Sequence, residues 1–124
     1  MIRKRWLARG AMWLAILLAV TMALLPHPPH VPVDRFGDKF EHMLAFATMT
    51  LLAAAGHPAT PLPRLAERFS FLGALIEVFQ SIPALHRDCD VLDWVADTAS
   101  IVVVLAVYGL VSRAYHSQQA SRAT

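Results

Sequence analysis

Four stretches of the chain are almost free of charge and close to the length that crosses a lipid bilayer. Of its 124 residues, 56% are hydrophobic and only 16% are charged, and the apolar residues are gathered into runs. A charged side chain at the centre of a membrane-inserted helix costs about 2.5–3.5 kcal/mol, so a run of about 20 apolar residues indicates a membrane-spanning helix. We expect four such helices and no additional soluble domain.

Proline-rich segments separate these runs. Residues 26–37 and the connector that follows Gly56 contain most of the prolines, which remove backbone donors and favour an extended chain. Inside lipid the backbone must satisfy its own hydrogen bonds, so even the valine-rich fourth run is expected to be helical. We predict an all-α fold, an integral membrane four-helix bundle that forms one domain over residues 1–124. The expected helices are about 6–25, 38–55, 65–82 and 93–111.

The first run has a basic start, as a secretory signal peptide does. Its apolar stretch is longer than the roughly 7–15 residues of a signal-peptide core. It ends in Pro26-His27-Pro28-Pro29 and lacks a small-residue cleavage site. We therefore predict a retained membrane anchor.

Basic residues near the ends of the runs predict the orientation, because short cytoplasmic flanks are enriched in lysine and arginine. If the N-terminus is cytoplasmic, eight of the eleven basic residues lie on that side, and only Arg35, Lys39 and Arg87 lie outside. Of the acids, only Glu67 is then cytoplasmic. Both termini are therefore predicted to be cytoplasmic.

With this orientation, polar residues from three helices meet at the outer face. Helical spacing groups His42 with Asp38, Glu77 with Gln80, and Asp93 with Asp97. The predicted binding residues are Asp38, Lys39, His42, Glu77, Gln80, Arg87, Asp93 and Asp97.

Glu77 is the most informative of these residues because apolar neighbours surround it inside the third run. A carboxylate within a membrane needs a partner and suggests a functional site. Lys39 and Arg87 are the cations within plausible reach. Three interpretations are consistent with this pattern: a structural salt bridge between helix ends, a binding or catalytic pocket, and a carboxylate that snorkels to the lipid headgroups.

Asp93 and Asp97 lie at the start of the fourth run. Asp93 is well placed as the N-cap of that helix, where a carboxylate accepts backbone hydrogen bonds. Capping explains Asp97 less well, because a second carboxylate four residues on repels the first; a cation, a metal or a proton would relieve the repulsion. His42 is more often a packing residue than a ligand in such a place.

Composition excludes several other classes. The net charge of +2 does not indicate nucleic-acid binding, because the basic residues flank apolar runs and form no stripe. The single cysteine, Cys89, excludes an intramolecular disulfide and a multi-cysteine metal site. His42, Glu77, Asp93 and Asp97 form a plausible ligand set for a divalent cation. However, Lys39 and Arg87 among the predicted binding residues favour ion pairing with the carboxylates, so we expect no cofactor and no metal.

These motifs, in this order, resemble the VanZ-like family of small bacterial membrane proteins. The matching elements are Asp38-Lys39-x-x-His42-x-x-x-Phe46, then Gly73-x-x-x-Glu77-x-x-Gln80, then Pro83, Arg87 and Asp93-x-x-Ala96-Asp97-x-x-Ser100, within roughly residues 34–110. The family usually has Asn at the position of Asp97 and Gly at that of Ser100, so the site of this chain is more acidic.

The resemblance implies a multi-pass protein of the bacterial cytoplasmic (inner) membrane. The family's namesake is associated with resistance to teicoplanin, and most members have no assigned activity. Two functions remain open. The first is an envelope protein whose partners are the lipid bilayer and either a lipid-linked or cell-wall-related ligand or another membrane protein. The second is an intramembrane enzyme acting on a lipid or lipid-linked substrate, with Glu77, His42 and Asp97 as candidate catalytic residues.

Overall fold

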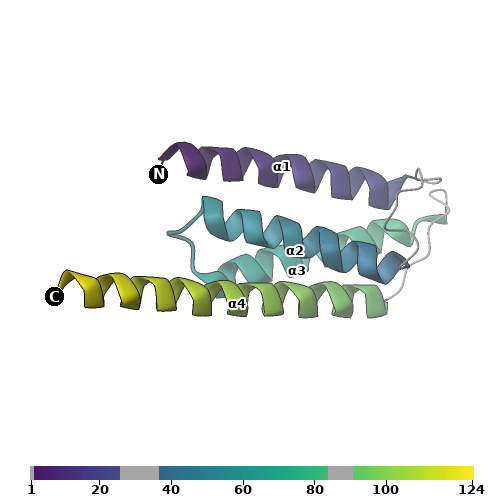
Figure 1. Ribbon diagram of the computed structural model, residues 1–124. Coiled ribbons are helices and arrows are strands. Elements are labelled where there is room, and N and C mark those ends of the chain that lie inside the picture. The colour runs from purple at the N-terminus through teal and green to yellow at the C-terminus, as the bar shows by residue number, and fades with distance from the viewer. Residues whose placement is uncertain (1, 26–36, 84–90) are drawn as a thin grey trace.

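Over the residues that the structure describes, the chain forms four α-helices, which confirms the predicted all-α fold (Figure 1). The computed structural model describes residues 2–25, 37–83 and 91–124. Its helices are α1 (Ile2–Leu24), α2 (Asp38–Gly56), α3 (Leu62–Gln80) and α4 (Val91–Ala123).

The largest differences from the predicted boundaries are at the start of α1, which begins at Ile2 and not near residue 6, at the start of α3 and at the end of α4. α3 begins at Leu62 and has Pro63 in its first turn, where the missing N–H has no intrahelical acceptor to lose. α4 continues to Ala123 and does not end near residue 111. No glycine or proline follows Gly109, and alanine, arginine and glutamine in this stretch favour helix. The prediction had equated the end of the apolar run with the end of the helix.

Successive helices run in opposite directions (Figure 1). α2 packs most closely against α1 and α4, and α3 packs mainly against α4. Both chain termini therefore lie at one end of the molecule, and α4 projects beyond the other helices there. The start of α2, the end of α3 and the start of α4 meet at the opposite end, which we call the distal end.

The apolar core is small and lies along α2 and α4. Met49 and Ile101 are fully buried, and Phe46, Ile76 and Leu105 surround them. α1 joins this core through Met12 and Ala23. Most other large apolar side chains of α1 and α4 are exposed.

Two helices are long and apolar enough to cross a membrane. α1 has a mean hydropathy of 1.9 and α4 one of 2.0 over their most apolar 18 residues. Only 11% and 17% of these stretches are buried, so neither helix is the enclosed core helix of a soluble protein. The apolar part of α2, Phe40–Gly56, is shorter. α3 carries four charged residues, which lower its apolarity: Arg64, Glu67, Arg68 and Glu77.

A cationic side chain connects α1 to α2 near the termini. Arg9 Nε donates to the carbonyl oxygen of Gly56 over 2.7 Å. A Cβ at position 56 would lie 2.9 Å from Arg9 Cγ and 3.2 Å from the Arg9 backbone nitrogen. Glycine is therefore required for this close approach of α1 to α2. The C-terminus of α2 carries a partial negative charge, which the cationic side chain of Arg9 offsets.

Candidate functional site

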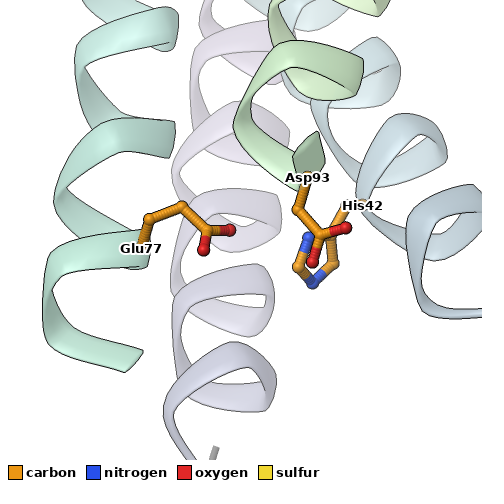
Figure 2. Close-up of side chains that lie close together, drawn as sticks. All are labelled: His42, Glu77 and Asp93. Atoms are coloured by element: carbon orange, nitrogen blue, oxygen red, sulfur yellow. The ribbon is translucent and has the colours of Figure 1, made fainter. Parts of the chain in front are cut away.

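Three helices each contribute a side chain to a polar cluster at the distal end. His42 comes from the first turns of α2, Glu77 from the last turn of α3 and Asp93 from the first turn of α4. Figure 2 shows the two carboxyl groups and the imidazole directed into the space between these helices. We call these three residues the distal cluster.

The distal cluster is compact. One nitrogen of His42 and one carboxylate oxygen each from Glu77 and Asp93 all lie within 4.8 Å of one another. Glu77 is 6% exposed and Asp93 8% exposed, and His42 is half-buried. Residues from three helices, separated by 16 to 51 positions in the sequence, are thus brought together in a sheltered place.

Asp97 lies close to the imidazole of His42. Its Oδ2 is 4.0 Å from His42 Nδ1, and the residue is 2% exposed. Among the described residues, Oδ1 of Asp97 is buried and has no hydrogen-bond partner. A separation of 4.0 Å is an ionic contact and too long for a hydrogen bond. The buried carboxylate therefore retains acceptor capacity beside His42.

α2 and α4 both pack against α3 at Gly73, one turn before Glu77. A Cβ on Gly73 would lie 3.4 Å from both Phe46 Cζ and Trp94 Cδ1, and 3.7 Å from Asp97 Oδ2. These are ordinary van der Waals distances, so the three helices are close here and the site has room for a methyl group but for little more. Close approach of this kind is the usual reason for small residues at helix contacts in membranes.

The acidic side chains oppose one another electrostatically. Asp93 and, more weakly, Glu77 repel the negative charge of Asp97. Two unit charges about 5 Å apart repel by roughly 3 kcal/mol at an effective dielectric constant of 20. This arrangement is stable only if a cation or a proton offsets part of the charge.

The side chains of two predicted counter-ions and of Asp38 lie outside the described residues. Asp38 and Lys39 belong to the first turn of α2, but only their backbone is described, and Arg87 falls in the segment 84–90. Their participation in the site stays a prediction.

Gln80 is 2% exposed and connects α3 to α1. Its Nε2 donates to the carbonyl oxygen of Ala23 over 3.0 Å, and among the described residues its Oε1 has no hydrogen-bond partner. The binding role of Gln80 stays a prediction, and Oε1 is the side-chain atom that would accept a hydrogen bond from a ligand. The expectation that Asp93 is an N-cap is wrong, because α4 begins at Val91 and Asp93 lies within its first turn.

Sequence reasoning missed a row of polar contacts between α3 and α4. Ser70 Oγ and Thr98 Oγ1 are hydrogen-bonded at 2.9 Å, and Trp94 Nε1 donates to the Ser70 carbonyl oxygen at 3.0 Å. On the other side of α4, Ser100 Oγ donates to the Met43 carbonyl oxygen at 2.9 Å. Hydroxyl groups in an apolar run were the available signal, since such groups seek partners on neighbouring helices.

The chemistry available to the distal cluster is that of buried carboxylates beside an imidazole. Such a group can hold a cation, accept hydrogen bonds from a ligand or transfer a proton. Comparisons with protein-family models, curated proteins and solved structures gave no match. The resemblance to the VanZ-like family therefore stays a prediction based on the motifs.

Proposed function

We propose that the chain is a multi-pass inner-membrane protein of the VanZ-like type whose distal cluster binds a ligand of the bacterial cell envelope. In this proposal all four helices cross the bilayer, both termini are cytoplasmic, and the distal end opens outward. The observation that carries the proposal is the convergence of His42, Glu77 and Asp93 within 4.8 Å at the end opposite the termini.

The surface of the helices supports membrane insertion. Exposed apolar side chains of α1 and α4 would face lipid, including Trp6, Trp13 and Leu17 of α1 and Val103 and Val107 of α4. α1 also makes contacts that a detachable leader would not need, since Met12 and Ala23 lie in the core. The apolar surface and the buried cluster together favour a membrane protein with a polar site at one face.

A second candidate function is intramembrane catalysis on a lipid or lipid-linked substrate. The specific observation in its favour is His42 close to Glu77 and to Asp97, which places a possible acid and a possible base in one sheltered site. In this case Glu77 or Asp97 would be the base, and His42 would exchange the proton.

The test is complementation of a host that lacks the protein. The measurement is the inhibitory concentration of a panel of cell-wall-directed antibiotics, teicoplanin included. We expect Glu77→Gln and His42→Ala to lose the effect of the wild-type protein. The matched controls, Glu67→Gln on the exposed face of α3 and His57→Ala at the end of α2, should retain it. Full activity of both cluster variants would exclude the proposed site.

Insertion and orientation are checked in the same cells. Cys89 is the only cysteine and lies in the predicted outer loop, so a membrane-impermeant maleimide should label it in intact cells. A Cys89→Ser, Ser117→Cys variant places the thiol at the opposite end and should be labelled only after lysis. Mass spectrometry of lipid extracts from these cells then distinguishes the two functions. A lipid species that depends on Glu77 would establish the enzyme, and an unchanged lipid profile would favour binding.

A further inference from the structure

We propose that the distal cluster holds a divalent transition-metal cation, with one ring nitrogen of His42 and one oxygen each of Glu77 and Asp93 as ligands. This inference rests on the proposed binding role of the same cluster and names the class of its ligand. Zn²⁺, Fe²⁺ and Mn²⁺ are the candidates.

The spacing of the three donor atoms is close to that of a metal site. Atoms bound to one cation at about 2.0–2.2 Å lie roughly 3 Å apart. The donor atoms of the distal cluster already lie within 4.8 Å of one another. A movement of each donor atom inward by about 1 Å would bring all three to ligand distance, and the remaining coordination position or positions would be open to water or a ligand.

Asp97 supplies the second, independent observation. An imidazole that binds a metal usually donates its other N–H to a carboxylate, which fixes the orientation of the ring. Asp97 Oδ2 faces His42 Nδ1 at 4.0 Å. Asp97 is 2% exposed, and its Oδ1 has no hydrogen-bond partner among the described residues. A shift of about 1 Å would form the hydrogen bond, and in the proposed site Nε2 of His42 would then bind the cation. Asp97 is thus a positioning residue.

The imidazole argues for a transition metal over the other cations that acidic groups attract. A cationic side chain such as Lys39 or Arg87 would offset carboxylate charge but would not account for a histidine beside the carboxylates. Mg²⁺ and Ca²⁺ prefer oxygen ligands, whereas mixed imidazole and carboxylate sets suit zinc, iron and manganese.

The experiment uses the full chain, purified in detergent without a polyhistidine tag and stripped of metal. Mn²⁺ is titrated and followed by electron paramagnetic resonance, and Zn²⁺ and Mg²⁺ are added as competitors. We expect one Mn²⁺ per chain, displaced by equimolar Zn²⁺ but not by equimolar Mg²⁺. Nitrogen hyperfine coupling in the pulsed spectrum should identify the imidazole ligand.

Variants separate this site from the other histidines and acids. His42→Ala should remove the nitrogen coupling, and Glu77→Gln should weaken Mn²⁺ binding at least tenfold. His57→Ala and Glu67→Gln serve as matched controls and should bind as the wild type does. Asp97→Asn should weaken binding by about 10–100-fold with the stoichiometry unchanged, as expected for a carboxylate that orients a ligand. Circular dichroism establishes that each variant keeps its helices.

Two results would overturn the inference: no saturable binding of Mn²⁺ or Zn²⁺, or equal affinity in the wild type and the folded Glu77→Gln and Asp97→Asn variants. Either result would leave the proposed function intact if the same variants still lose the envelope effect. Metal binding together with full envelope activity of the cluster variants would have the opposite meaning and exclude only the proposed function.

Discussion

The two ends of the helix assembly use buried polar groups in opposite ways. Near the termini, Arg9 meets the carbonyl oxygen of Gly56 at 2.7 Å, and a cation is matched to a carbonyl at a helix C-terminus. At the distal end, Asp97 lies 4.0 Å from His42 and is repelled by Asp93 and Glu77. The distance between Arg9 and Gly56 is that of a hydrogen bond, whereas Oδ1 of Asp97 has no hydrogen-bond partner among the described residues. The first contact stabilises the packing of α1 on α2, and the second is the one to which the proposed function assigns a binding role.

The largest effect on stability is expected at the terminal end. Arg9→Ala removes a charged donor and leaves the Gly56 carbonyl oxygen without this partner, which should cost about 1.5–3 kcal/mol of unfolding free energy. The measurement is unfolding in a denaturing detergent followed by circular dichroism. Arg9→Lys is the matched control, and it should recover part of the loss because the charge remains. A stability equal to that of the wild type would contradict a stabilising role for the terminal end.

The two buried glycines should respond differently to alanine. At Gly56 the new Cβ would lie 2.9 Å from Arg9 Cγ, so α1 and α2 must separate, at a cost of about 1–3 kcal/mol. At Gly73 the nearest atoms are 3.4 Å away, and we expect a change below about 1 kcal/mol, since alanine also favours helix. Thermal unfolding of both variants tests the difference. Equal losses would mean that the distal end is packed as tightly as the terminal one.

A small effect of the opposite sign is expected at Asp97. Asp97→Asn removes a charge that is buried and that Asp93 and Glu77 repel, so the metal-free protein should become more stable, by on the order of 1 kcal/mol. The same unfolding assay measures this gain, with Glu67→Gln on the exposed face of α3 as the neutral control. A clear loss of stability would show that Asp97 serves the fold, and the contrast between the two ends would disappear.

The sequence was sufficient to predict four helices and the meeting of His42, Glu77, Asp93 and Asp97 at one end. The length of an apolar run predicts a helix. Because successive helices run in opposite directions, the start of the second helix, the end of the third and the start of the fourth lie at the same face. The sequence could not predict the partner of Gln80, because spacing along one helix does not identify the neighbouring helix. Arg9 was visible as a charge inside an apolar run, a pattern that calls for a partner. That this partner is the carbonyl oxygen of Gly56 could be seen only in the structure, which shows how α1 packs on α2.

The length of α4 has a geometric consequence for anything attached to it. Residues 113–123 are exposed and continue the helix, which adds about 16 Å of rigid rod at 1.5 Å per residue. Each residue added to or removed from this rod turns its tip by about 100° around the axis. A fluorescent reporter joined to the rod by a short helical linker would therefore point in a direction set by the linker's length. In a series of such linkers, polarised fluorescence would measure how the orientation of the reporter relative to the bundle changes with each added residue.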